Sequence, residues 1–88
     1  MTIINPADAV ETRLAVKAAI EYNGPVYLRL GRLAVPVIFD DDYKFEWGKG
    51  VQLKEGTDVT LVATGLLVHE ALKAHDILKE KGISARVI

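Results

Sequence analysis

The sequence contains no cysteine, which excludes disulfide bonds, thiolate metal ligands and thiol catalysis. No apolar run approaches the ~20 residues of a membrane-spanning helix, and the N-terminus lacks the basic and then apolar layout of a secretory signal. Lys and Arg number 11 against 12 Asp and Glu, so neither a nucleic-acid footprint nor a basic membrane patch follows from composition. We expect a soluble, cytoplasmic protein.

The chain of 88 residues is long enough for one small domain and too short for two. At this length folding buries only about 60 to 65 per cent of the surface that the unfolded chain exposes. Met1–Ile4 and Ile83–Ile88 are β-prone runs at the two ends, with no turn or polar tail beyond them. We expect a segment of a larger protein, with a complete small domain ending in an edge strand as the alternative.

The first half of the chain predicts a helix followed by a strand. Asn5 suits an N-cap, Pro6 suits the first helical position, and the predicted helix runs to about Tyr22. Its polar stripe is narrow and consists of Arg13, Lys17 and Glu21. A helix this apolar needs neighbours on several sides, and the chain is too short to supply them. A strand is predicted at Val26–Leu30, after the Gly24-Pro25 stop.

The second half predicts a β-α-β unit. Residues 31–42 have no helical period and are predicted to be an extended linker, and Phe45–Lys54 is predicted to be a short edge strand. Val59–Ala63 has the continuous apolar character of a strand covered on both faces. An amphipathic helix then presents Leu67, Ala71, Ala74 and Leu78 on one face and ends at Gly82. The strand Ser84–Ile88 is expected to lie parallel to the preceding one, with a right-handed crossover. The expected fold class is α/β, a helix-strand unit followed by a β-α-β unit and the edge strand.

Several short motifs occur together in order. They are Pro6-Ala7-Asp8, Gly24-Pro25-Val26-Tyr27, Arg29-Leu30-Gly31-Arg32, Val62-Ala63-Thr64-Gly65 and the run from Gly82 to Ile88. Together they resemble transketolase, particularly the C-terminal subunit of bacterial split transketolases. The resemblance covers essentially the whole chain. It implies that residues 1–33 end a pyrimidine-binding domain, 34–44 link two domains, and 45–88 begin the C-terminal transketolase domain.

The resemblance also implies what the parent enzyme does and what this chain lacks. The parent transfers two-carbon ketol units between sugar phosphates in the pentose phosphate pathway, using thiamine diphosphate and Mg²⁺. In that family the carboxylate that activates the cofactor and the groups that orient the sugar lie upstream of the matching segment, and the diphosphate and Mg²⁺ site lies in another domain or subunit. We therefore expect this chain alone to be inactive, without catalytic, cofactor-binding or metal-binding residues. Its expected partner is the rest of the transketolase chain or the N-terminal subunit, and in isolation we expect self-association.

Arg32 is the one residue that the resemblance carries over to a site. The spacing of Arg32 and Pro36 matches the family arginine that binds the substrate phosphate. A guanidinium at the carboxyl end of a parallel strand offers a planar fork to a phosphate. The alternative is an arginine that only covers the strand end or pairs with Asp40. Arg29 lies on the other face of the strand, where a structural ion pair is favoured over a substrate contact.

Other polar residues are better explained by structure than by chemistry. Asp8 is expected to cap the first helix, His69 to be solvated and His75 to pack. The two histidines lie about 120° apart on their helix and cannot bind one metal together. Asp40–Asp42 is expected to be a solvated linker, because it lacks the spaced ligands of a calcium loop.

Two glycine-containing turns and the tryptophan complete the candidates. Gly48-Lys49-Gly50 and Thr64-Gly65 lack the context of a phosphate-binding loop, although the second precedes a helix that can attract an anion. Trp47 is expected to anchor the linker against the second unit.

Three other functions stay open. Deoxyxylulose-phosphate synthase and the beta subunit of a 2-oxo acid dehydrogenase are related thiamine enzymes. Arg32 argues against the 2-oxo acid dehydrogenase, whose substrates carry no phosphate at this place. It distinguishes transketolase from deoxyxylulose-phosphate synthase only weakly. A free-standing interaction module, docking a partner on the helix of residues 5–22, is the rival from another class.

Overall fold

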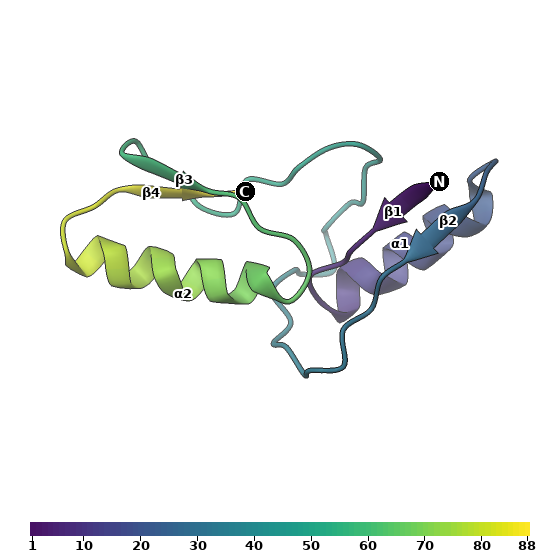
Figure 1. Cartoon of the computed structure of the whole chain (residues 1–88), viewed down its shortest axis with the longest axis horizontal. Helices are drawn as coiled ribbons and strands as arrows, with labels where there is room; N and C mark the ends of the chain where they lie inside the picture. The colour runs from purple at the N-terminus through teal and green to yellow at the C-terminus, as the bar shows by residue number, and fades with distance from the viewer.

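Six elements follow one another along the chain and form two β-α-β units joined by a long connection (Figure 1). The elements are β1 (Thr2–Ile4), α1 (Ala9–Glu21), β2 (Val26–Leu28), β3 (Val59–Leu61), α2 (Leu67–Glu80) and β4 (Ala85–Val87). The computed structural model describes all residues from 1 to 88. The molecule is elongated, with extents of 45 × 25 × 25 Å. The predicted α/β class is confirmed, and neither helix is long and apolar enough to cross a membrane.

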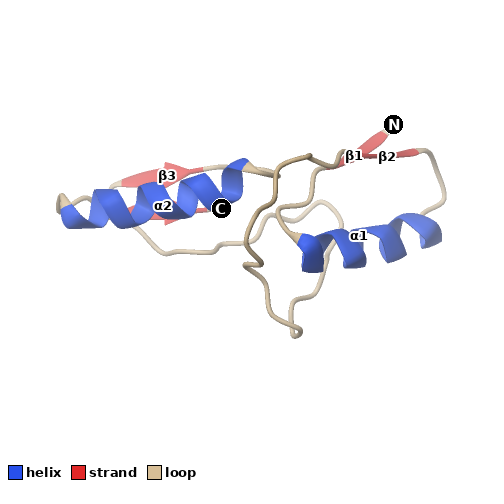
Figure 2. Ribbon diagram, turned by 90° about the horizontal axis from the view of Figure 1, so that it is seen from below, coloured by secondary structure: helices blue, strands red, loops and turns tan.

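The first unit contains one strand more than the predicted helix-strand pair. β1 lies parallel to β2, with Ile3 opposite Tyr27 in the register. The helix α1 lies along one face of this strand pair (Figure 2), and Ala15 from its middle is buried. Ile3 and Tyr27 are 67% and 54% exposed. The opposite face of this small sheet is therefore open and apolar.

The helix α1 begins at a different residue from the one predicted. Its N-cap is Asp8 and not Asn5, and an Asp8 carboxylate oxygen accepts from the Glu11 N–H at 2.8 Å. The Glu11 carboxylate in turn accepts from the Ala7 N–H at 2.7 Å. This reciprocal arrangement satisfies two N–H groups at the helix start with charged acceptors, which a neutral Asn5 cap does not match. The predicted end is confirmed, because Tyr22 is the C-cap.

The connection between the units contains almost no regular structure. The segment 45–54, predicted to be an edge strand, pairs with the second sheet at one residue only, where Lys54 forms an antiparallel bridge with Val87. A turn from Glu46 to Lys49, with Gly48 at φ +68°, interrupts the extended conformation that pairing needs. The lone edge pairing is therefore much shorter than expected.

Trp47 packs on the first unit, so its predicted place against the second unit is wrong. The Trp47 ring lies 4.7 Å from the ring of Tyr22, the C-cap of α1, measured between centroids. Phe45 meets Trp47 edge to face at 5.4 Å. The aromatic cluster forms here because Tyr22 offers an apolar ring at the exposed end of α1.

The second unit has the predicted parallel β-α-β arrangement. β3 lies beside β4, with Val59 opposite Ala85 and Leu61 opposite Val87. The helix α2 packs on β4, and Val68, Ala85 and Val87 are buried. The prediction that both faces of the strand after Asp58 are covered is wrong, because Val59 and Val62 are 41% and 76% exposed. Val59 and Val62 therefore present apolar surface that no other part of this chain covers.

Gly56 provides a test of how the connection meets the second unit. A Cβ at this position would lie 2.1 Å from the backbone carbonyl carbon of Ala85. We expect Gly56→Ala to lower the free energy of unfolding by roughly 1–3 kcal/mol, because backbone atoms have to move. Urea unfolding followed by circular dichroism measures this change.

Gly50→Ala is the matched control. There the added Cβ would lie 3.1 Å from a side-chain methyl group of Ile88, which can rotate away. Equal losses of stability in the two variants would show that the contact of Gly56 with β4 has no special role.

Candidate functional site

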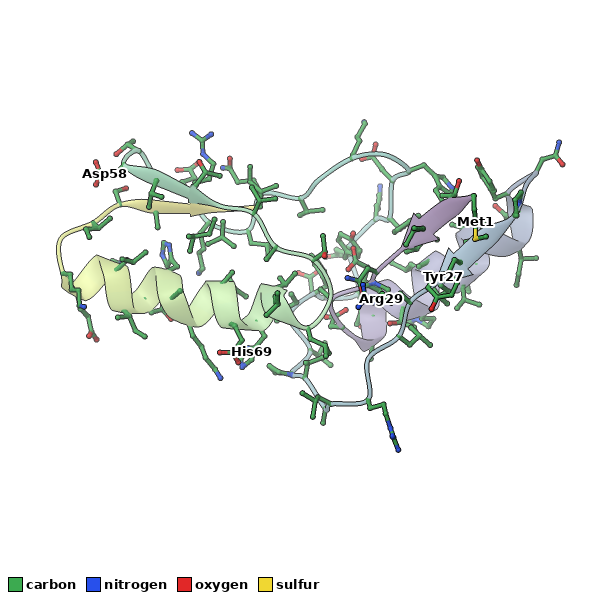
Figure 3. The ribbon with its side chains drawn as sticks, viewed as in Figure 1. Met1, Tyr27, Arg29, Asp58 and His69 are labelled. Carbon is green, nitrogen blue, oxygen red and sulfur yellow. The ribbon has the colours of Figure 1, made fainter.

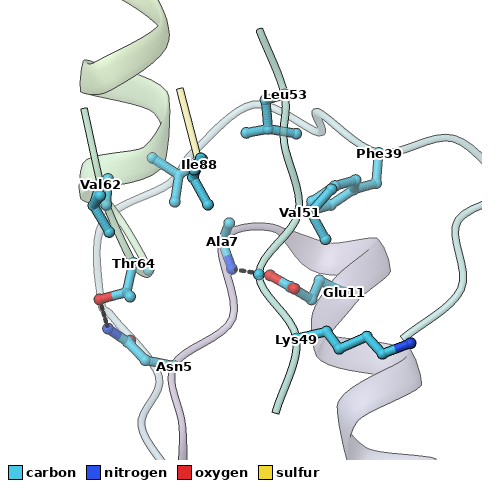
Figure 4. A pocket seen from close by; sticks show the side chains of 14 residues that line it. Asn5, Ala7, Glu11, Phe39, Lys49, Val51, Leu53, Val62, Thr64 and Ile88 are labelled. Atoms are coloured by element: carbon cyan, nitrogen blue, oxygen red, sulfur yellow. Dashed lines mark hydrogen bonds between the residues drawn. The ribbon is translucent and has the colours of Figure 1, made fainter. Parts of the chain in front are cut away.

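The strands of both units run toward the middle of the molecule, where their C-terminal ends face one another (Figure 1). Between them lies a cavity of about 220 Å³ (Figure 4). Asn5 lines it from the end of β1, Thr64 from the end of β3 and Ile88 from the end of β4, and Glu11 and Lys49 complete the polar lining. Carboxyl ends of parallel strands are where open α/β sheets bind ligands. The central cavity is therefore a candidate binding site.

Asn5 joins the two units across this cavity. Its side-chain amide donates to the Thr64 hydroxyl at 3.0 Å, and its backbone carbonyl accepts from the Gly65 N–H at 3.1 Å. Gly65 is buried at φ +59°, and a Cβ there would lie 2.5 Å from the Asn5 side-chain oxygen. The turn Thr64-Gly65 therefore has a structural role, and Asn5 binds this turn in place of capping α1.

Asp8 is buried beside the cavity, with 3% of its surface exposed. One carboxylate oxygen caps α1, and the other accepts from the backbone N–H groups of Ile38 and Phe39 at 2.8 and 2.9 Å. The carboxylate is fully engaged by backbone donors of its own chain. The prediction that Asp8 caps the helix is confirmed, and the contact with residues 38 and 39 was not predicted.

Glu11 has the only side-chain carboxylate in the lining of the cavity, and its two oxygens are both occupied. One accepts from the Ala7 N–H at 2.7 Å and the other from the Tyr43 hydroxyl at 2.8 Å. Phe39 stacks on Tyr43, with ring centroids 3.9 Å apart. Burial raises the pKa of Tyr43 above its ordinary value, and the hydrogen bond and negative charge of Glu11 raise it further. The Tyr43 hydroxyl therefore stays protonated and donates its hydrogen bond to Glu11.

Arg32 lies in the loop that follows β2, beyond the C-terminal ends of β1 and β2. Its side chain is exposed and makes no ion pair or hydrogen bond within the chain. The alternative partner Asp40 does not engage it. The nearby ion pair joins Arg13 to Asp41 at 3.8 Å, between two well exposed side chains. The guanidinium of Arg32 is consequently available to a ligand.

Arg29 has an anchoring role through its backbone. Its N–H donates to the Ile4 carbonyl at 2.8 Å, which extends the parallel pairing of β1 and β2 by one bond. The predicted structural ion pair is wrong, since the exposed side chain has no acidic partner within 4 Å. Figure 3 shows Arg29 near the middle of the molecule and Asp58 at its far end.

The two histidines of α2 lie where the periodicity places them. The His75 Nδ1 lies 2.8 Å from the Ala85 carbonyl, and because a carbonyl only accepts, this nitrogen carries the proton. His75 therefore fastens α2 to β4, as expected of a packing residue. His69 lies on α2 (Figure 3), but it is half-buried and not fully solvated as expected. It makes no hydrogen bond. Asp40–Asp42 forms a turn in which Asp40 accepts from the Asp42 N–H at 3.0 Å.

One sequence signal pointed to the engaged carboxylates. Asp8 and Glu11 have the three-residue spacing of a capping box, which identifies the helix start without Asn5. The contacts of Asp8 with Ile38 and Phe39, and of Glu11 with Tyr43, join residues about 30 positions apart. No periodicity or local motif reports contacts of that separation.

Residues 48–88 match the family "Transketolase, C-terminal domain". A subunit of the apulose-4-phosphate transketolase of Phocaeicola vulgatus is 47% identical over 89 residues, which are 100% of this chain and 28% of that protein. A subunit of the 6-deoxy-6-sulfo-D-fructose transketolase of a Clostridium species is 41% identical over 88 residues, 100% of this chain and 27% of that protein.

A solved structure is similar over the same extent. A split-gene transketolase in the form of an inactive β4 tetramer is 53% identical and superposes with a TM-score of 0.95. The superposition covers 99% of this chain and 29% of that one. The chain therefore spans less than a third of the length of the relatives that it matches.

Tyr43 provides a pH test of the Glu11 contact. We expect Glu11→Gln to lower the pKa of Tyr43 toward the ordinary ~10, because the carboxylate acceptor and its charge are lost while burial stays. Ultraviolet titration of phenolate, in chains that also carry Tyr22→Phe and Tyr27→Phe, follows Tyr43 alone.

The sign of the linked stability effect follows from the raised pKa. The raised pKa of Tyr43 stabilises the folded state, and this stabilisation is fully present below pH ~10, the pKa of tyrosine in the unfolded chain. It is lost as the pH rises from there through the folded pKa, and Glu11→Gln reduces this alkaline loss. An unchanged titration of Tyr43 in Glu11→Gln would contradict the assignment.

Proposed function

Because the chain belongs to the transketolase family, we propose that it forms part of an enzyme that transfers two-carbon ketol units between sugar phosphates. The match with subunits of two sugar transketolases, over the whole length of this chain, supports the proposal. Residues 1–33 would end a pyrimidine-binding domain, 34–44 link the domains and 45–88 begin the C-terminal domain. The family match over 48–88 supports the last of these assignments.

Arg32 would bind the substrate phosphate in the assembled enzyme. The single observation that carries this role is its exposed guanidinium, unpaired within the chain and located beyond the carboxyl ends of two parallel strands. A guanidinium binds phosphate through two parallel hydrogen bonds and keeps its charge at all working pH values. Arg32 would therefore supply affinity and orientation for the sugar phosphate and take no part in moving protons.

Thiamine diphosphate and Mg²⁺, which the family implies, do not fit the residues of this chain. The carboxylates nearest the central cavity belong to Asp8 and Glu11, and both are occupied by hydrogen-bond donors of the chain itself. No three residues of the kinds that ligate metals are grouped together. We therefore assign the cofactor and the chemical steps to the rest of the enzyme.

The partner would be the rest of the transketolase chain or its N-terminal subunit. Fifteen large hydrophobic residues are exposed, among them Met1, Ile3, Val16, Ile20 and Tyr27 of the first unit. Monomeric proteins rarely expose large apolar patches, so this many exposed apolar side chains support a covering partner. The similar split-gene transketolase is a tetramer of β subunits, which supports self-association when the other partner is missing.

The alternatives make different predictions. A deoxyxylulose-phosphate synthase or a 2-oxo acid dehydrogenase beta subunit would show another acceptor or donor preference in the assembled enzyme. A free-standing interaction module is favoured by the exposed Val16 and Ile20 on α1, and it would fold as a stable monomer.

The proposed role of Arg32 is tested by kinetics of the assembled enzyme. We expect Arg32→Ala to raise the KM for phosphorylated substrates about tenfold, because a charge-assisted hydrogen bond at a solvated site contributes about 1.4 kcal/mol. Arg29→Ala is the matched control, another exposed arginine on the same segment, with an expected KM close to that of the wild type. An unchanged KM in Arg32→Ala would remove Arg32 from the site.

Self-association of the isolated chain is tested by sedimentation velocity. We expect species larger than the 9.6 kDa monomer, since the apolar face of α1 and the open sheets have no cover within the chain. Ile20→Lys should shift the distribution toward the monomer, and Glu21→Lys on the polar stripe should not. A monodisperse monomer with a sharp thermal transition would favour the interaction module instead.

A further inference from the structure

The loop that carries Arg32 is fastened at both of its ends to the start of the first unit. At one end the Arg29 N–H donates to the carbonyl of Ile4, the last residue of β1. At the other end the N–H groups of Ile38 and Phe39 donate to one oxygen of Asp8. Residues 30–37 therefore form a loop closed by three hydrogen bonds, and two of the three depend on a single carboxylate oxygen.

Between these ends the loop has little support of its own. Leu30, Leu33 and Val37 are 58%, 73% and 61% exposed, and a surface cavity of about 420 Å³ separates the loop from the first turn of α1. Gly31 makes the close approach, since a Cβ there would lie 2.7 Å from the Leu66 side chain. Apart from this contact of Gly31 with Leu66, the position of Arg32 depends on where the loop ends are held.

The two carboxylate oxygens of Asp8 accept hydrogen bonds from two different segments. Its Oδ1 accepts from the Glu11 N–H and caps α1, while its Oδ2 accepts only from the loop. The side chain is 3% exposed, so water does not readily replace either set of donors. Buried charge-assisted bonds to N–H groups hold a loop more firmly than exposed neutral ones.

We propose that Asp8 is the positioning residue for Arg32, holding the loop 30–37 so that the guanidinium meets the substrate phosphate. This inference rests on the proposed function. Loss of the Oδ2 contacts lets the loop ends separate and Arg32 sample many positions, so the phosphate is bound less often in the productive geometry.

Asp8→Ser separates the two tasks. A serine hydroxyl at an N-cap still accepts from the N–H three residues on, but it is one atom shorter and has no second oxygen for the loop. Asp8→Asn is the second variant, because its amide offers one acceptor in place of two and keeps the size of the side chain. Thr12→Val is the matched control, since it removes only the hydrogen bond from the Thr12 hydroxyl to the Asp8 carbonyl within α1.

The experiment measures steady-state kinetics of the assembled enzyme with fructose 6-phosphate and with fructose, and inhibition by inorganic phosphate. We expect Asp8→Ser and Asp8→Asn to raise the KM for fructose 6-phosphate and the inhibition constant of phosphate about fivefold. The kcat, and kcat/KM with fructose, should stay within about twofold of the wild type. Thr12→Val should leave all of these values unchanged.

The double variant separates this inference from the proposed function. In the Arg32→Ala background, Asp8→Ser should cause no further rise in KM, because the group that it positions is gone. If Arg32→Ala raises the KM and both Asp8 variants behave like Thr12→Val, positioning by Asp8 is overturned and the proposed function stands. If Arg32→Ala has no effect, the phosphate role itself fails. Equal loss of kcat/KM with both sugars would show a general structural role and overturn the proposal.

Discussion

The arrangement of the first unit depends on one buried carboxylate. Asp8 receives three backbone N–H groups, one from the start of α1 and two from the connection that follows β2. An isolated carboxylate at 3% exposure would be costly, and its burial is sustained only because donors surround it. The same interaction therefore begins the helix, fixes where the connection turns back and sets the place of the loop that bears Arg32.

Specific polar contacts connect the two units, and little apolar surface is buried in the chain. Only 8 of 88 residues are buried, and these few are divided between the units. At the junction Asn5 binds Thr64 and Gly65, and the buried Gly65 allows the close approach. Such contacts orient the units, but they contribute much less free energy than a shared apolar core. The exposed apolar faces are the surfaces on which a covering partner would act.

The candidate site lies at the carboxyl ends of the parallel strands, and the residues there determine which chemistry it can support. Parallel strands of both units end at the centre, and Arg32, Asn5 and Thr64 follow strand ends directly or within a few residues. Arg32 presents an unpaired cation in the loop after β2 and does not line the central cavity, while the acidic group of that cavity, Glu11, is satisfied by the chain itself. The arrangement is suited to holding an anion and orienting it. It supplies no free base and no group of metal ligands.

Local patterns in the sequence determined the α/β class, both helices and the parallel β-α-β unit of the second half, because helix caps, glycine stops and hydrophobic period act within a few residues. The candidate site was predictable only as far as Arg32, through its resemblance to a family motif. Tertiary structure decided the contacts of Asp8 with Ile38 and Phe39, the packing of Trp47 on Tyr22, the single bridge at Lys54 and the open face of β3. Each of these depends on which distant donor, ring or strand comes within a few ångströms once the chain has folded, and spacing along the sequence carries no record of that distance.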